Sequence, residues 1–237
     1  IYRSDALQAT ITASPISGLT ASQLEVMRFA QKDDTIILVH PEFSPIKINR
    51  ITDTNWQAAT LSLTNIPYYS FSGLAVTSPN ASITASATSG LSVTITASSG
   101  VFSTSHVGQL ITVATGGILF ITEYVSTTKI RANTRVALSG TSIPSGDWEL
   151  ETGYEPVWSS TRGYPVSIAF FQQRLWFGGS KSRTQTVWAS TTNDYFDFDL
   201  GTAADSDAIS VTIDDTHVNP IRHLHVGRNL AVFTSGA

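Results

Sequence analysis

Apolar and polar residues alternate over short segments of this chain, and this pattern predicts strands. Residues 91–97, Leu-Ser-Val-Thr-Ile-Thr-Ala, change between apolar and small polar at every step, which is the period of a strand with one buried face. Further strands are predicted at residues 109–113, 118–125 and 129–135. Gly116-Gly117 suits a tight hairpin between two of them, because glycine reaches positive φ without steric cost.

Three segments outside this region share one pattern of a short apolar strand, a polar turn and a second apolar strand. They are residues 27–40, 168–179 and 223–234. In the first two copies a third strand is predicted after a loop, at residues 46–50 and 185–189. Repeated groups of short strands are typical of the blades of a β-propeller.

The spacing of the three copies indicates an insertion. Ile36, Leu175 and Leu230 open the second strand of each copy, at intervals of 139 and 55 residues. The difference, 84 residues, equals the length of segment 67–150, and without that segment the period is about 50, within the range of propeller blades. The sequence therefore predicts an all-β fold: partial β-propeller blades with a small β-barrel or sandwich domain inserted.

The predicted organisation has three parts: residues 1–66 as the first propeller segment, 67–150 as the inserted domain and 151–237 as the second propeller segment. Without the insert, 153 residues remain, enough for about three blades, whereas closed propellers typically have four to eight. We therefore expect the second segment to be truncated and the chain to be a piece of a longer protein.

Charge is scarce and unevenly distributed. Only 14% of the residues are charged, against roughly 25% in soluble domains, and the 69 residues from Thr54 to Thr122 contain no Asp, Glu, Lys or Arg. The 30 Ser and 31 Thr residues suit a surface that is buried against neighbouring subunits, because burying hydroxyls costs less than burying ions. The ten Arg and four Lys residues are scattered, which disfavours high-affinity DNA binding.

Other classes are excluded by what the chain does not contain. With no cysteine it has no disulfide framework, thiolate zinc site or cysteine nucleophile. No apolar stretch approaches the ~18 residues of a membrane span. The hydrolase motifs Gly-x-Ser-x-Gly and His-Glu-x-x-His are missing.

Several aromatic motifs in the second half resemble the signature of the nozzle, or DNA-stabilisation (tail tubular), proteins of short-tailed bacteriophages. These motifs are Gly163-Tyr-Pro165, Phe170-Phe-Gln-Gln-Arg-Leu-Trp-Phe-Gly-Gly179, Val187-Trp-Ala-Ser190 and Asn193-Asp-Tyr-Phe-Asp-Phe198. Matching features elsewhere are residues 31–41 with Pro45, Arg50 and Trp56, residues 107–111 and 147–150, and the acidic segment 205–209. The family usually has a Pro before the Val-Trp strand, where this chain has Thr184-Gln185.

The resemblance covers most of residues 28–237, and its motifs are structural. It implies a structural protein of the virion, located in the phage tail and not an enzyme. Such a protein forms a homo-oligomeric ring, commonly a hexamer, below the portal or adaptor and among other tail proteins. The ring surrounds the DNA exit channel, where it retains and conducts DNA without sequence-specific binding. No cofactor, metal or catalytic residue is implied.

A run of aspartates leaves three interpretations open. Seven Asp residues lie between positions 194 and 215, with no Lys or Arg from Arg183 to Arg222: Asp194, Asp197, Asp199, Asp205, Asp207, Asp214 and Asp215. They could form a solvated acidic loop or bind calcium, which prefers carboxylate oxygens. They could also face a channel and repel DNA phosphates.

The histidines allow one metal hypothesis. His217, His223 and His225 lie close in sequence to Asp214 and Asp215, and three converging ligands would be needed for zinc. Histidines on a half-exposed strand face are the simpler interpretation. His40 and His106 are isolated and are predicted to be structural.

Two functions of other classes remain as alternatives to the nozzle. The first is a carbohydrate-binding or host-receptor-contact module of a phage tail, with the inserted domain as the binding element. Trp148, Trp158, Trp176 and Trp188 could supply a sugar platform, although Trp176 and Trp188 lie in repeat strands, where core packing is the default. The second is a propeller hydrolase, although the Ser-x-Asp-x-Gly-x-x-Trp turns of sialidase propellers are missing.

Residues 178–182, Gly-Gly-Ser-Lys-Ser, resemble a phosphate loop but precede a strand, so they are predicted to be a hairpin connection.

Overall fold

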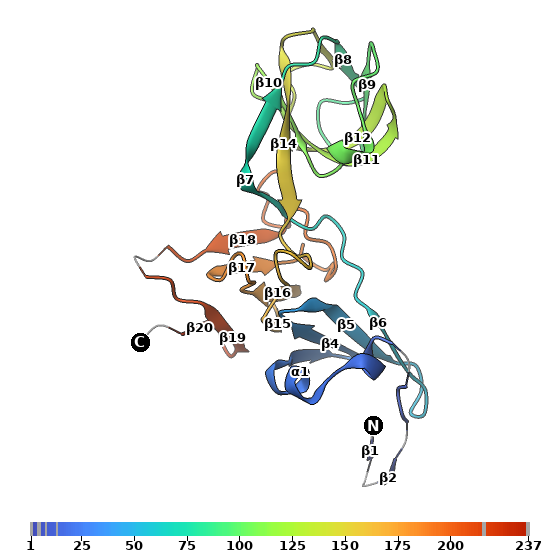
Figure 1. The fold of residues 1–237 in the computed structure, drawn as a ribbon, viewed down its shortest axis with the longest axis vertical. Coiled ribbons are helices and arrows are strands. Elements are labelled where there is room, and N and C mark those ends of the chain that lie inside the picture. Colours follow the sequence, from blue (N-terminus) through green and yellow to red (C-terminus); the bar gives the residue numbers. More distant parts are fainter. Residues whose placement is uncertain (1, 4–5, 8, 13, 215–216, 236–237) are drawn as a thin grey trace. The chain divides into compact units, whose positions relative to one another are not determined.

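The computed structural model describes residues 2–3, 6–7, 9–12, 14–214 and 217–235, and most of their regular secondary structure is antiparallel strands (Figure 1). Within these ranges lie the short helix α1 (Ala21–Val26) and two 3-10 turns (Ile16–Gly18 and Thr104–His106). None of the helices there is long and apolar enough to cross a membrane. The prediction of an all-β chain is confirmed.

Contacts divide the chain into two compact units, described separately below. Unit 1 contains Ile1–Ile66, Val157–Asp199 and Ala208–Ala237, and unit 2 contains Pro67–Pro156 and Leu200–Asp207. Unit 1 also includes the small pair of strands β1 (Tyr2–Arg3) and β2 (Ala6–Leu7).

The first sheet of unit 1 has four antiparallel strands in sequence order. They are β3 (Arg28–Lys32), β4 (Thr35–His40), β5 (Phe43–Arg50) and β6 (Trp56–Thr60). The hairpin predicted at 27–40 and the third strand predicted at 46–50 are present, although β5 begins earlier, at Phe43. Ile37, Val39 and Ile46 are buried and hold this sheet to the core of the unit.

A second sheet of unit 1 repeats this order of strands. It consists of β15 (Ser167–Phe171), β16 (Arg174–Gly178), β17 (Thr186–Ala189) and β18 (Ile209–Thr212). The turn between β15 and β16 is formed by Gln172 and Gln173, both at positive φ (47° and 58°), as a two-residue hairpin of matching twist requires. The predicted second hairpin and its third strand are therefore confirmed.

The third predicted hairpin is formed by β19 (Ile221–Val226) and β20 (Leu230–Thr234), which pair with each other alone among the described strands. Strand β15 packs against both β3 and β19, so the first strands of the two sheets and of the hairpin are neighbours within unit 1.

Buried aromatic rings hold the second sheet together. Trp158 packs edge to face against Phe177, Trp188 and Phe198, with ring centroids 5.2, 5.3 and 5.1 Å away. All four side chains are at most 5% exposed. These rings bring the segment before β15, two strands and a loop into one core.

Unit 2 contains one sheet of eight antiparallel strands in the order β13-β8-β9-β12-β11-β10-β14-β7. The strands are β7 (Tyr68–Thr77), β8 (Ile83–Ala85), β9 (Val93–Ala97), β10 (Leu110–Val113), β11 (Ile118–Ser126), β12 (Lys129–Val136), β13 (Ser142–Ile143) and β14 (Trp148–Pro156). The four strands predicted in this region correspond to β9, β10, β11 and β12, and β10 and β11 form the expected hairpin at Gly116-Gly117.

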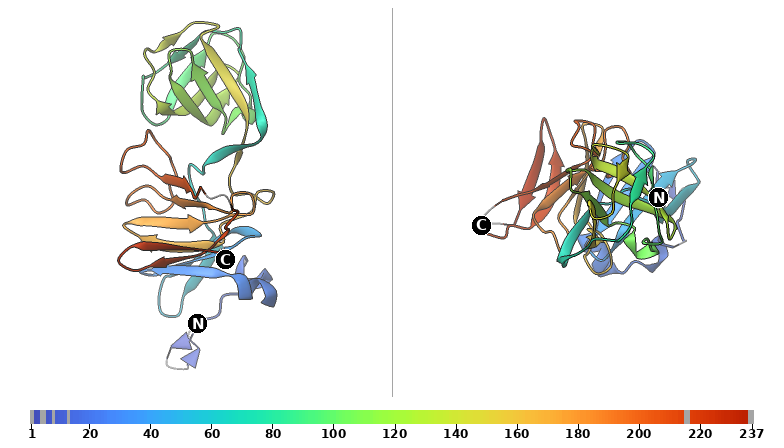
Figure 2. Two further views of the ribbon diagram at one scale, coloured as in Figure 1. Left: turned by 90° about the vertical axis from the view of Figure 1, so that its left-hand side faces the viewer. Right: turned by 90° about the horizontal axis from the view of Figure 1, so that it is seen from above.

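The sheet of unit 2 curls around one apolar core without closing (Figure 2). Residues 67–156 are all described, and β13 and β7 are the two edges of their sheet, so it is not a closed barrel. The barrel expected as one alternative is therefore wrong: the edge strands do not pair with each other. Side chains from β8 to β14 share the core, with Trp148 the largest of them.

Candidate functional site

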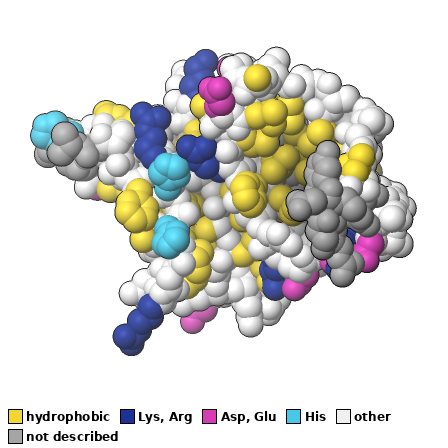
Figure 3. Space-filling view, turned by 90° about the horizontal axis from the view of Figure 1, so that it is seen from below, with side chains coloured by type: hydrophobic (Ala, Val, Ile, Leu, Met, Phe, Trp, Pro, Cys, Tyr) yellow, Lys and Arg dark blue, Asp and Glu magenta, His cyan; other side chains and the backbone are white. Residues whose placement is uncertain are grey.

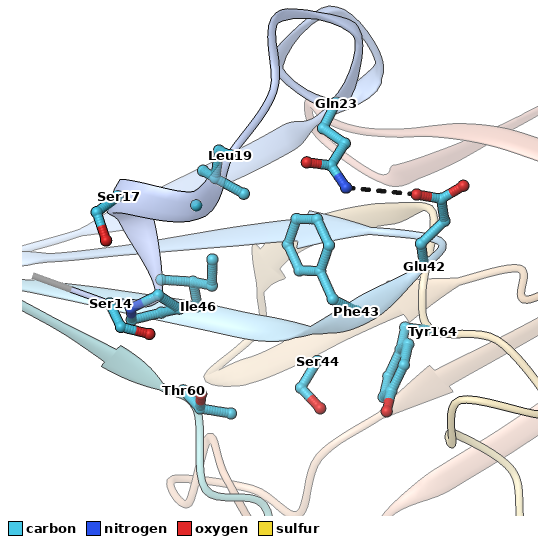
Figure 4. Close-up of a pocket in the computed structure, with 12 residues that line it drawn as sticks. Ser14, Ser17, Leu19, Gln23, Glu42, Phe43, Ser44, Ile46, Thr60 and Tyr164 are labelled. Carbon is cyan, nitrogen blue, oxygen red and sulfur yellow. Dashed lines mark hydrogen bonds between the residues drawn. The ribbon is translucent and has the colours of Figure 1, made fainter.

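A pocket of about 490 Å³ lies in unit 1 beside the start of β5 (Figure 4). It is lined by residues of the segment before α1, of α1 itself, of β5 and β6, and of the loop before β15: Ser14, Pro15, Ser17, Gly18, Leu19, Gln23, Glu42, Phe43, Ser44, Ile46, Thr60 and Tyr164. Figure 4 shows Gln23 and Glu42 facing each other on one side of Phe43, with Ser44 and Tyr164 on the other. We take this pocket as the candidate site.

The turn between β4 and β5 fixes Glu42 and Phe43 through a buried histidine. The His40 ring stacks on Phe43, with centroids 4.5 Å apart and an interplanar angle of 9°. His40 Nδ1 accepts a hydrogen bond from the Glu42 backbone N–H at 3.2 Å. Burial lowers the pKa of His40 below its ordinary value of 6.5, although the Glu42 carboxylate acts in the opposite direction. His40 is thus a neutral structural residue, as predicted.

Helix α1 orients the amide that faces Glu42. Thr20 caps the helix: its Oγ1 accepts from the Gln23 backbone N–H at 3.3 Å, and Gln23 Oε1 accepts from the Thr20 N–H at 3.0 Å. Because Oε1 is engaged in this capping box, Gln23 Nε2 is left to donate to Glu42 Oε2, at 3.4 Å. The carboxylate is therefore held at the edge of the pocket.

The opposite wall comes from a distant part of the sequence. The Tyr164 backbone N–H donates to the Pro41 carbonyl at 3.0 Å, which holds the loop before β15 beside the β4–β5 turn. The pocket thus combines two aromatic rings, one carboxylate, one amide and several hydroxyls. Such a lining can stack on an apolar face of a ligand and form hydrogen bonds with its hydroxyls. Among the described residues of its lining Glu42 is the one carboxylate, whereas glycoside hydrolysis ordinarily needs two.

Three of the described aspartates, Asp194, Asp197 and Asp207, accept hydrogen bonds from the protein. Asp194 accepts from the Phe196 N–H at 3.1 Å, and Asp197 accepts from Asn65 Nδ2 at 2.8 Å. Asp207 Oδ2 accepts from two backbone N–H groups of its own loop, at 2.9 and 2.8 Å. Asp199 is buried, and Asp205 and Asp214 are exposed. Asp215 lies outside the described residues.

The two metal hypotheses gain no support from the described part of the chain. It contains no group of three His, Asp or Glu side chains that could hold a metal ion. His217, and His223 and His225 on β19, are all exposed. His106 Nδ1 accepts from the Ser103 N–H at 3.3 Å, and burial lowers the pKa of His106, which fits the predicted structural role.

The tryptophans do not form an exposed sugar platform. Trp148, Trp158 and Trp188 are buried, so the platform interpretation is wrong for them, and the core packing predicted for Trp188 is right. Trp176 is half-buried, and its Nε1 donates to the Phe171 carbonyl at 3.1 Å. Gly178 ends β16, and residues 179–182 lie in the connection between the paired strands β16 and β17, so the predicted hairpin connection is confirmed.

Sequence reasoning assigned a binding role to no residue of the pocket, and it named Tyr164 only as part of the motif Gly163-Tyr-Pro165. One signal was available: Thr20 followed by Gln23 is the spacing of a capping box and marks the start of α1. The approach of Tyr164 to Pro41 has no local signal, because more than a hundred residues separate them.

Comparison with models of known protein families gave no match, and comparison with curated proteins gave no significant match.

Proposed function

We propose that the chain is a structural protein of a phage virion, a component of the tail nozzle that forms a homo-oligomeric ring around the DNA exit channel. Its partners are other copies of itself, the portal or adaptor, other tail proteins, and DNA that passes without sequence-specific binding. In this proposal the two sheets and the hairpin of unit 1 are blades of a partial β-propeller, and unit 2 contains the inserted domain.

The observation that carries the proposal is the packing of β15 against β3 and β19. In a propeller, four-stranded meanders are arranged around a central axis, and the first strands of successive blades are neighbours. Each of the two four-stranded sheets of unit 1 is such a meander, and they begin with β3 and β15. Together with the aromatic motifs that resemble nozzle proteins, this arrangement favours the nozzle over other all-β proteins.

Pairing at the base of unit 2 supports the inserted domain. Tyr68 on β7 lies opposite Pro156 on β14, so the chain enters and leaves residues 67–156 at adjacent positions. A domain whose ends are adjacent can occupy one loop of a host fold without distorting it. This loop connects β6, the last strand of the first sheet, to β15, the first strand of the second.

The insertion can be tested by replacing residues 67–156 with a short Gly/Ser linker. We expect the amides of β3 to β5 and β15 to β17 to keep their protection from hydrogen exchange, because the linker joins neighbouring points. Loss of protection throughout unit 1, with correct folding of the full chain under the same conditions, would contradict the inserted-domain arrangement.

The ring can be tested by sedimentation velocity of the full chain over a range of concentrations, followed by negative-stain electron microscopy. We expect one discrete oligomer whose proportion rises with concentration, and ring-shaped particles. A monomer at every concentration would count against the nozzle. Mobility shifts with DNAs of different sequence should show no sequence preference.

Saccharide binding is a second candidate function, favoured by the lining of the pocket around Phe43. Its aromatic rings, carboxylate, amide and hydroxyls are the groups that bind sugars, and they lie in unit 1 rather than in the inserted domain. A glycan array with the full chain tests this. If a glycan binds here, Glu42→Gln should weaken binding, whereas Glu25→Gln, a change at another exposed residue of unit 1, should not. Binding of no glycan would remove this candidate.

A further inference from the structure

Two neighbouring pockets of unit 1 lie beside β19 and the segment before β15. They share Pro41, Val166 and Arg222. The larger, about 310 Å³, is also lined by Val26, Arg28 and His223, and the smaller, about 140 Å³, by Gly179, Ser180, Lys181, Thr184, Pro220 and Ile221. We refer to the two together as the Arg222 pockets.

The charge of the Arg222 pockets is positive, in a chain whose net charge is −4. Arg28, Lys181 and Arg222 contribute three cations, and no Asp or Glu is among the described residues that line these pockets. Figure 3 shows several Lys, Arg and His side chains close together on one side of the face seen from below, next to apolar side chains. A site of this charge attracts anions.

The donors of these cations are available. Within the described ranges, the side chains of Lys181 and Arg222 form no hydrogen bond or ion pair with the protein. Arg28 uses Nη1 for the Met27 carbonyl, at 3.0 Å, which leaves its other donors for a ligand. Guanidinium and ammonium groups bind oxyanions through short, charge-assisted hydrogen bonds.

The backbone around Arg222 is held by main-chain hydrogen bonds. Val166 N–H donates to the Gly178 and Gly179 carbonyls, at 3.2 and 3.1 Å, and Ile221 N–H donates to the Thr184 carbonyl at 2.9 Å. Gly179, at φ 62°, approaches so closely that a Cβ there would lie 3.1 to 3.3 Å from Val166, Thr184 and Ile221. The cations therefore project from a fixed frame, which reduces the entropy lost on binding.

We propose that the Arg222 pockets bind an oxyanion of the phosphate class. The contacts come from side chains: the Gly179 and Ser180 N–H groups already donate to the Thr186 and Arg183 carbonyls, at 2.8 and 3.0 Å. Residues 178–182 therefore do not act as a phosphate loop, whose backbone N–H groups cradle the anion. They supply Lys181 to a site that Arg222 and Arg28 complete.

This chemistry is shared by inorganic phosphate and by the backbone phosphates of a nucleic acid, and the proposal does not depend on the proposed function. The test is an NMR titration of the arginine Nε–Hε signals of the full chain with inorganic phosphate. Sodium chloride at matched ionic strength is the reference, because screening affects all exposed charges. We expect saturable shifts for Arg222 and Arg28 with phosphate and none with chloride.

Variants locate the site. Arg222→Gln should weaken phosphate binding about tenfold or more, since it removes a charged donor, and Lys181→Gln should weaken it from a different segment of the chain. Arg222→Lys should retain part of the affinity. The matched control is Arg228→Gln, an exposed arginine in the turn after β19 that lines neither pocket, and it should leave binding unchanged.

A short oligothymidylate separates the two sources. Binding of the oligonucleotide more tightly than phosphate, with the same dependence on Arg222, identifies nucleic acid as the source. Binding of phosphate alone identifies a free anion. The proposal is overturned if neither binds saturably, or if Arg228→Gln weakens binding as much as Arg222→Gln.

Discussion

Two equally buried tryptophans should respond very differently to the same substitution. Trp148 in unit 2 is 1% exposed, and its Nε1 donates to the Ala81 carbonyl at 2.7 Å. Trp158 in unit 1 is 5% exposed, and its Nε1 is buried with no hydrogen-bond partner among the described residues. Replacement by Phe removes the same atoms from each core, so the loss of apolar burial and the cavity are similar. The hydrogen bonding differs.

The difference can be estimated from the polar atoms alone. Trp148→Phe leaves the buried Ala81 carbonyl without its donor, which costs about 1–3 kcal/mol. Trp158→Phe removes a buried N–H donor that has no partner, and this relieves a desolvation penalty of about 1–3 kcal/mol in the folded state. The Trp158 ring stands edge-on to three neighbouring rings, and a weak N–H to ring contact would offset part of that gain. Trp148→Phe should therefore cost about 2 kcal/mol or more beyond Trp158→Phe.

Native-state hydrogen exchange measures both changes in the full chain. The amides of β9 to β12 report the opening free energy of unit 2, and those of β15 to β17 that of unit 1. Each variant should lower protection in its own unit only, and Trp148→Phe should lower it more. Equal losses in the two units would show that Trp148 gains nothing from its bond to Ala81, and the reasoning would be wrong.

Three further predictions concern single residues. Gly179→Ala should destabilise unit 1 by about 1–2 kcal/mol in urea unfolding, because its positive φ disfavours a Cβ and the space around it is filled; an unchanged midpoint would contradict this. Burial lowers the pKa of His40 in the folded protein below 6.5, so the unfolded chain binds a proton at higher pH than the folded chain does. The stability that neutral His40 contributes is therefore present above pH 6.5 and is lost as the pH falls below it. The substitution His40→Asn should flatten this dependence of the unfolding free energy on pH. Burial, and then the hydrogen bond from its hydroxyl to Glu151 at 2.9 Å, raise the pKa of Tyr154 to about 12. The phenolate absorbance of Tyr154 should appear last in an alkaline titration, and at lower pH in Glu151→Gln.

The strands were predictable where one face is buried and the other is not. Residues 91–97 alternate, and β9 has the buried side chains of Val93, Ile95 and Ala97 at every second position. Strand β7 was not predicted: from residue 72 to its end both faces are exposed, so no alternation is imposed on its sequence. The sequence also could not predict that the sheet of unit 2 stays open at its edges, because pairing between strands distant in sequence leaves no local pattern.

The sequence by itself determined the antiparallel strands, the three hairpins, the structural role of His40 and the core packing of Trp188. Each follows from local alternation or from side-chain chemistry that favours burial. The tertiary structure alone decided which side chains meet. Tyr164 reaches Pro41, and Arg28, Lys181 and Arg222 gather around Val166, because sheets far apart in the chain pack through their first strands. The free energy of that packing comes from buried area between segments, and such area has no period along the sequence.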